Sequence, residues 1–182
     1  MKTKVLLVSE KYIKENSALS DNYFGKFLTP AIIEAQDMGL QSILGSCLYE
    51  KLLSLVEENI IEESGYTAYK ALLDDYVQSY LLYEVLSNNV LYSNIKLANL
   101  GTHLSNDEHV VNLSQKDFDL LQQDFKYKAD FYCKRMQEWL LNNQNNFPEL
   151  DACACEQLRA NLKSMENCGL WLGGRYSKRL RD

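Results

Sequence analysis

The stretch from Ser114 to Phe147, SQKDFDLLQQDFKYKADFYCKRMQEWLLNNQNNF, decides the fold. Large aromatic side chains recur in it at a strict spacing of seven residues: Phe118, Phe125, Tyr132 and Trp139. Since seven residues return almost to the same side of an α-helix, these rings form one stripe. Apolar side chains fill in beside the rings: Leu121, Ala129, Met136 and Leu140. The pattern predicts one helix of about 30 residues, roughly 45 Å long at 1.5 Å per residue.

Both ends of this helix carry residue types that start and stop helices. Ser114 with Asp117 resembles a capping box, in which a hydroxyl accepts a hydrogen bond from an unpaired amide. Pro148 cannot continue the backbone hydrogen-bond ladder. A helix of this length is often a lever or an interface between subunits. The alternative is an ordinary core helix whose aromatic side chains face their own domain.

The rest of the chain predicts shorter helices with polar connections between them. Ser9 is expected to cap a brief helix, Thr29–Pro30 to open a second one, and Thr67 to cap a third. Gly39 and Gly45 are expected to bend or break the second run. The third helix has a regular apolar stripe that is rich in tyrosine: Tyr69, Leu72, Leu73, Tyr76, Val77, Tyr80 and Leu81.

Residues 92–113 lose the helical period and contain several asparagines, which predicts a long loop. A loop of about 20 residues is uncommon unless it has a function. The 182-residue chain has only 8 glycines and 2 prolines, which disfavours a sandwich or a barrel. We therefore predict an all-α helical bundle with a long helix in the C-terminal half, extended termini and one long loop. Residues 1–150 are expected to form a helical domain, and residues 151–182 a C-terminal extension with a basic tail.

Composition excludes several classes of protein. The net charge of -6 disfavours a general polyanion binder, because an acidic surface repels phosphates. No apolar run is long enough to cross a bilayer. Residues 1–8 lack the longer apolar region and the cleavage site of a signal peptide, so we expect a protein made in the cytoplasm.

The sequence predicts no enzyme, no cofactor and no metal. It has only two histidines, and it lacks a P-loop, a dinucleotide fingerprint, a zinc-protease motif and a nucleophile elbow. The odd number of five cysteines, without a secretion signal, favours reduced thiols over a disulfide framework: Cys47, Cys133, Cys153, Cys155 and Cys168. The last three could offer thiolates to zinc, but no fourth ligand is obvious nearby. A polar cluster in the long loop matches no helical ligand pattern and is interpreted as solvated: His103, Asp107, Glu108 and His109.

The C-terminus combines an apolar anchor with concentrated positive charge. The anchor is Leu170, Trp171 and Leu172, and the basic residues that follow it are Arg175, Lys178, Arg179 and Arg181. Exposed large apolar residues on a terminal segment usually need a partner, so we expect this segment to dock on another subunit. The alternatives are binding to a nucleic-acid backbone and a disordered solubilising terminus.

Several stretches spread over nearly the whole chain carry a family resemblance: Leu7–Ser17, Pro30–Asp37, Ile43–Tyr49, Asp74–Leu86, Ser105–Val110, Lys128–Tyr132 and Gly169–Arg175. Together they resemble the head–tail connector, or adaptor ring, proteins of tailed phages. The resemblance is to the small helical proteins of crAss-like and other Bacteroidetes phages and prophages. None of the stretches is a catalytic motif.

The resemblance implies a structural virion protein, made in the host cytoplasm and placed at the head–tail interface. Copies would form a homo-oligomeric ring, typically a dodecamer, below the portal protein. The other partners would be tail and connector proteins, and no membrane is involved. Genomic DNA would pass through the lumen without sequence-specific binding.

Two sets of residues are inferred from their chemistry for this role. The C-terminal anchor and the basic residues after it are expected to dock on the portal or on a neighbouring copy. Four glutamates are expected to line the channel, because like charge lets DNA slide: Glu57, Glu58, Glu62 and Glu63. The alternative function is a soluble helical protein-binding module with no virion role, which holds its partner through the tyrosine-rich third helix.

Overall fold

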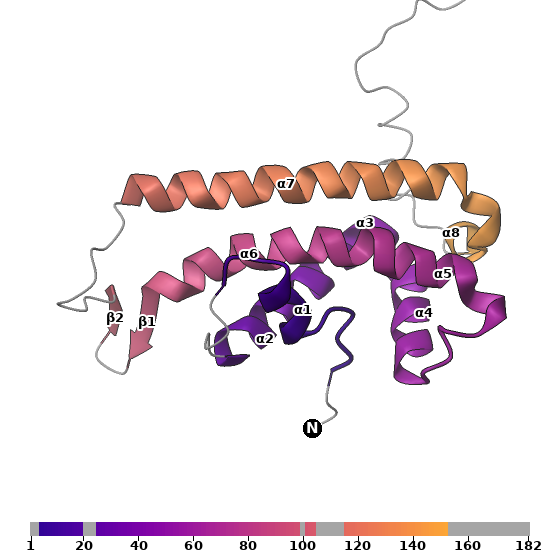
Figure 1. The fold of residues 1–182 in the computed structure, drawn as a ribbon, viewed down its shortest axis with the longest axis horizontal. Helices are drawn as coiled ribbons and strands as arrows, with labels where there is room; N and C mark the ends of the chain where they lie inside the picture. The colour runs from indigo at the N-terminus through magenta and orange to yellow at the C-terminus, as the bar shows by residue number, and fades with distance from the viewer. Residues whose placement is uncertain (1–3, 20–24, 99–100, 105–114, 153–182) are drawn as a thin grey trace, which may run out of the picture.

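The computed structural model describes residues 4–19, 25–98, 101–104 and 115–152, and these residues are mainly helical (Figure 1). The α-helices are α1 (Glu10–Glu15), α2 (Gly25–Glu34), α3 (Gln41–Leu44), α4 (Ser46–Glu57), α5 (Thr67–Ala71), α6 (Gln78–Asn94), α7 (Gln115–Asn142) and α8 (Glu149–Ala152). Two π-helical segments, η1 (Ala35–Leu40) and η3 (Leu72–Val77), and two 3₁₀ turns, η2 (Ser64–Tyr66) and η4 (Gln144–Asn146), connect them. The prediction of an all-α fold is confirmed.

One short hairpin interrupts the helical pattern. Strand β1 (Ile95–Ala98) pairs antiparallel with β2 (Gly101–Leu104), and Ile95 lies opposite Leu104. The prediction of one irregular loop over residues 92–113 is therefore wrong in its first half, because α6 runs to Asn94 and the hairpin follows. Ile95 and Leu97 alternate with other residues, a strand period that the many asparagines obscured. Residues 105–114 lie outside the described part of the chain.

The centre of the fold is an antiparallel pair of long helices. One of them is the continuous run of α5, η3 and α6, and the other is α7, which lies along it (Figure 1). Rings from the two helices meet with centroid distances of 5.3 Å for Tyr83–Tyr132 and 4.8 Å for Tyr76–Trp139. Phe147, which follows η4, meets Tyr69 at 5.1 Å. Ala129 and Met136 are fully buried between the two helices. Phe125, Tyr132 and Trp139 of the aromatic stripe of α7 therefore pack against the core of their own domain.

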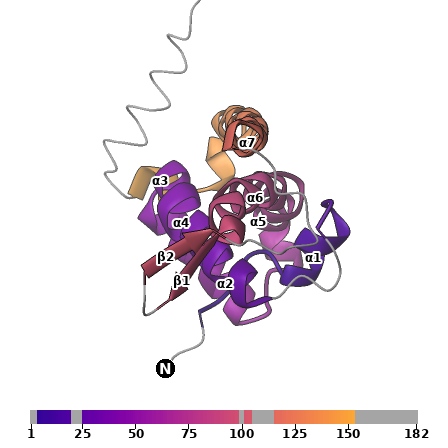
Figure 2. The same ribbon diagram turned by 90° about the vertical axis from the view of Figure 1, so that its left-hand side faces the viewer.

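The remaining helices form a layer on the other side of the α5–α6 run (Figure 2). Buried side chains from α2, η1, α3 and α4 join those of the helix pair in one hydrophobic core that extends from Leu7 to Phe147. Helix α8 packs against α4, and the Tyr69 hydroxyl donates a hydrogen bond of 2.8 Å to a carboxylate oxygen of Glu149. Burial and this carboxylate both raise the pKa of Tyr69. The end of the described chain is thus fixed to the bundle.

The N-terminal arm is held by one buried glutamine. The Leu7 amide donates to Gln36 Oε1 at 2.8 Å, and Gln36 Nε2 donates to the Val5 carbonyl at 3.2 Å. Ser9 caps α1 as predicted, since its hydroxyl accepts from the Tyr12 amide at 3.1 Å. The arm therefore enters the bundle at a defined position.

The two predicted threonine caps are wrong. Helix α2 already begins at Gly25, and the Thr29 hydroxyl donates back to the Gly25 carbonyl at 3.1 Å. Pro30 lies inside the helix but is exposed, so water can satisfy the carbonyl that loses its partner there. Thr67 is the first residue of α5, and its hydroxyl donates to the Ser64 carbonyl at 3.0 Å.

The two predicted glycine interruptions differ. Gly45 has a φ of 76° and separates α3 from α4, so the predicted break occurs there. Gly39 lies within η1 and does not end the helical run. A Cβ at this position would lie 2.4 Å from the hydroxyl oxygen of the buried Tyr80. Gly39 is therefore required for the close approach of η1 to α6.

We expect Gly39→Ala to lower the free energy of unfolding by about 1–3 kcal/mol, because overpacking against Tyr80 outweighs the gain in helix propensity. Chemical denaturation followed by circular dichroism measures this change. Gly65→Ala is the matched control, since nothing lies within 4 Å of its added Cβ. Adding Tyr80→Phe should restore stability to Gly39→Ala, and a double variant as unstable as the single one would contradict the explanation.

Within α7, Trp139→Ala should lower the free energy of unfolding by about 2–3 kcal/mol, because it removes the ring that stacks on Tyr76. Tyr127→Ala removes an aromatic ring from the opposite side of the same helix, where the side chain is 74% exposed. This control should change stability by less than about 0.5 kcal/mol. Equal losses in the two variants would show that the packing of α7 is assigned to the wrong face.

Candidate functional site

A polar pocket of about 350 Å³ lies between η1, α6 and α7. Its titratable lining residues are Glu34, Tyr80, Glu84, Lys126, Asp130 and Cys133. The Glu84 side chain is only 10% exposed, and Lys126 Nζ lies 3.0 Å from both of its carboxylate oxygens. The ammonium group thereby compensates a nearly buried negative charge. The Glu84–Lys126 ion pair joins α6 to α7 beside the aromatic packing.

The groups around this ion pair are poorly suited to catalysis. Burial raises the pKa of the Cys133 thiol to about 11, with Asp130 and Glu84 adding to the shift. Burial, with Glu84 as a second cause, also raises the pKa of Tyr80. Both groups are therefore protonated at neutral pH, and a protonated thiol is a weak nucleophile. Within the described residues, no three histidine, cysteine, aspartate or glutamate side chains form a group that could hold a metal.

The described cysteines differ in their chemical state. Cys133 is a free thiol on α7, whereas Cys47 on α4 is disulfide-bonded. The expectation of reduced thiols is thus confirmed for Cys133 and wrong for Cys47. The three cysteines weighed as zinc ligands lie outside the described part of the chain.

Lys126→Met should lower the free energy of unfolding by about 2 kcal/mol, because it leaves the Glu84 carboxylate without its ammonium partner. Thermal and denaturant unfolding measure the change. Lys11→Met is the control, since the Lys11–Glu15 pair is highly exposed and should contribute less than about 0.5 kcal/mol. Adding Glu84→Gln to Lys126→Met should recover part of the lost stability. If it does not, the unpaired Glu84 carboxylate is not the cause of the loss.

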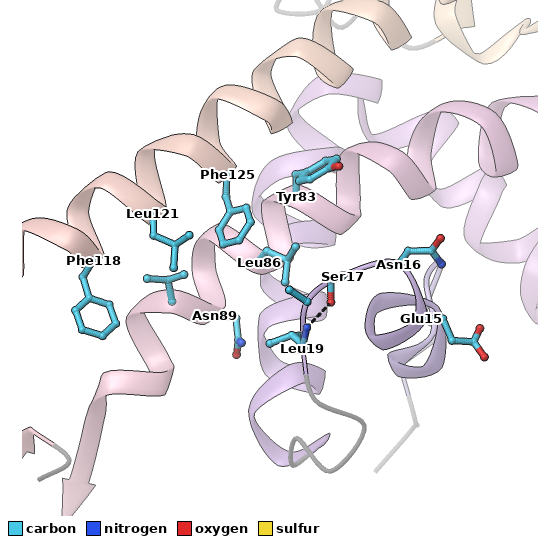
Figure 3. A pocket seen from close by; sticks show the side chains of 12 residues that line it. Glu15, Asn16, Ser17, Leu19, Tyr83, Leu86, Asn89, Phe118, Leu121 and Phe125 are labelled. Atoms are coloured by element: carbon cyan, nitrogen blue, oxygen red, sulfur yellow. Dashed lines mark hydrogen bonds between the residues drawn. The ribbon is translucent and has the colours of Figure 1, made fainter. Parts of the chain in front are cut away.

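A larger, apolar groove of about 670 Å³ lies beside the N-terminal half of α7 (Figure 3). Phe118, Leu121 and Phe125 line it from α7. Tyr83, Leu86, Asn89 and Val90 line it from α6, and residues 15–19 line it from the α1 side. Beyond Tyr83, the α6 positions that face α7 carry smaller side chains, which do not fill the space beside the phenylalanines. We call this the α6–α7 groove.

A second apolar surface lies on the side of α7 that faces away from the bundle. Leu120, Tyr127 and Phe131 are 55%, 74% and 57% exposed. They are separated by seven and four residues, so they share one helix face, opposite the buried Ala129 and Met136. We call Leu120, Tyr127 and Phe131 the outer face of α7. Single exposed apolar residues are ordinary, but three aligned ones are typical of an interaction surface.

The four glutamates predicted to line a channel lie close together in the chain and are all exposed. Glu57 ends α4, and Glu58, Glu62 and Glu63 follow in the connection to η2. Glu62 forms an ion pair with Lys70, so its charge is partly offset. The structure thus presents these carboxylates at one corner of the bundle, and their role in a channel stays a prediction.

Other predicted residues lie outside the described part of the chain. They include the anchor at residues 170–172, the basic residues after it, and residues 107–109 of the loop cluster. The sequence interpretation missed both the outer face of α7 and the α6–α7 groove. The outer face had a readable signal, a second apolar stripe at positions 120, 127 and 131. The groove had none, since it depends on which α6 residues lie opposite α7.

Comparison with known proteins gives a family without a known activity. Residues 40–159 match a family described as a family of unknown function, DUF6712. No curated protein and no solved structure matches the chain. None of the helices in the described residues is long and apolar enough to cross a membrane. The matched segment covers most of the bundle, from the end of η1 through α8, and the chain therefore belongs to the DUF6712 family.

Proposed function

We propose that the protein is a structural virion protein, a head–tail connector that assembles as a ring below the portal and forms part of the DNA channel. The observation that carries this proposal is the outer face of α7. Its three apolar side chains are exposed, whereas Ala129, Met136 and Leu140 on the opposite face of the same helix are buried in the core. An assembly protein needs such a surface, whereas an isolated bundle is better solvated without it.

The composition around the outer face suits a contact between protein subunits. Exposed charged residues of both signs alternate along the same side of α7: Lys116, Asp124, Lys134 and Glu138. An apolar centre with a charged rim is the usual anatomy of a protein–protein interface. Mixed charges at the rim add specificity and register rather than affinity. In a ring, this surface would meet a different surface of the next copy, which is the contact that closes a circle.

The exposed glutamates support the channel part of the proposal. Glu57 at the end of α4, and Glu58 and Glu63 in the connection that follows, are exposed. If this corner lines the ring, its carboxylates repel the phosphate backbone and keep DNA from adhering. The basic residues near the C-terminus carry the opposite charge and would contact acidic protein surfaces instead of DNA: Arg175, Lys178, Arg179 and Arg181.

The alternative is a protein-binding module without a virion role. The sequence predicted that such a module would hold its partner through the tyrosine-rich third helix, which corresponds to the α5–α6 run. Tyr76 and Tyr83 stack on rings of α7, so they are engaged within the chain. Such a module would have to bind its partner through the outer face of α7. The two functions are distinguished by self-assembly, which a connector requires and a binding module does not.

Electron microscopy of the purified full-length chain, alone and with isolated portal protein, tests the proposal. We expect ring-shaped particles, either of the chain alone or formed on the portal. Tyr127→Lys combined with Phe131→Lys should abolish the rings, because two charges would be placed in the apolar centre of the contact. Tyr127→Phe is the matched control and should assemble like the wild type.

A chain that stays monomeric in the presence of portal would contradict the connector proposal. Rings that form equally well with both lysines in place would show that the outer face of α7 is not the contact. Circular dichroism confirms that the variants are folded, which is expected because both positions are exposed.

A further inference from the structure

We propose that the α6–α7 groove is the docking site for residues Leu170–Leu172 of a second copy of the chain. The inference rests on the proposed ring, because it assigns the apolar anchor of one copy to a cavity in the next. It assigns a binding site to the apolar anchor, for which the sequence alone allowed several partners.

The shape and lining of the groove suit a large apolar anchor. Its volume of about 670 Å³ lies within the range of ordinary ligand sites. Phe118, Leu121 and Phe125 point from α7 toward α6, and Leu86 faces them (Figure 3). An indole ring flanked by two leucines presents the kind of surface that such a cavity buries well. Aromatic anchors of this type dominate the energetics of many protein interfaces.

Polar residues also line the groove. Asn16, Ser17 and Asn89 line it with the apolar residues, and the Ser17 hydroxyl accepts the Leu19 amide at 3.2 Å. Glu15 also lines it and is exposed. The anchor is followed within ten residues by Arg175, Lys178 and other basic residues. An exposed carboxylate in the lining therefore complements the charge that arrives with the anchor.

The length of the chain beyond α8 is sufficient for an exchange between copies. Helix α8 ends at Ala152, near the C-terminal end of α7 (Figure 1). The groove is lined by residues of the N-terminal half of α7. The roughly 18 residues from Ala152 to Leu170 span at most about 60 Å when fully extended. The described chain ends in α8 at one end of the bundle and the groove lies toward the other, an arrangement that suits a head-to-tail contact between copies. Such contacts close into rings when the rotation between copies permits.

Photo-crosslinking of the full-length chain tests this inference. Benzoylphenylalanine is incorporated at position 171 in place of Trp171, and the products are separated on a denaturing gel. We expect covalent dimers after illumination, with crosslinked peptides that contain residues 118–125 or 86–90. Leu121→Lys should reduce the dimer yield at least fivefold, because it places a charge in the groove at a position that is already 38% exposed. Asn142→Lys, also on α7 and exposed, is the control and should leave the yield unchanged.

Each outcome decides between docking in a second copy and its alternatives. Crosslinks within one chain would overturn the inference, since the anchor would then occupy its own groove. So would crosslinks that map elsewhere or that persist in Leu121→Lys. If rings form but position 171 does not reach the groove, the connector function stands and this inference fails. If the crosslinked dimers form but no rings are seen with portal, the docking stands and the connector function fails.

Discussion

The structure depends on the antiparallel packing of two aromatic stripes, one on the α5–α6 run and one on α7. Both stripes repeat every seven residues, so Tyr83 meets Tyr132 and, one repeat further, Tyr76 meets Trp139. Stacked or edge-on rings add about 0.5–1.5 kcal/mol per pair beyond the burial of their area. Because the repeats match, α7 cannot rotate without breaking every pair. This packing therefore fixes which side of α7 faces the bundle.

The two surfaces of functional interest follow from that constraint. Once Ala129 and Met136 are buried, Leu120, Tyr127 and Phe131 must point away from the bundle. Toward its N-terminus, α7 continues to present phenylalanines after the seven-residue tyrosine repeat of α6 ends at Tyr83, where Val90 takes the next position, and the α6–α7 groove results. The Glu84–Lys126 ion pair lies on the other flank of the same contact. A single helix thus supplies a core face, an exposed apolar face and one wall of a groove.

The seven-residue stripe predicted both the all-α class and the long helix, because periodicity over many turns leaves few alternatives. Local signals were less reliable where tertiary contacts compete with them. Ser9 caps α1 as its type suggests, but the Thr29 hydroxyl donates to Gly25 within a helix that started earlier. The hairpin at residues 95–104 escaped notice since each strand has only four residues. The groove was beyond prediction, because it depends on the register between α6 and α7.

The central claim is that the outer face of α7 is a contact between copies of the chain. Hydroxyl-radical footprinting measures this directly, because Tyr127, Phe131 and the exposed Met38 all react with the radical when they are in contact with water. The account predicts that Tyr127 and Phe131 become protected when the full-length chain assembles, while dilution to the unassembled state restores their oxidation. Oxidation of both residues at the same rate in the assembled and unassembled states would contradict it.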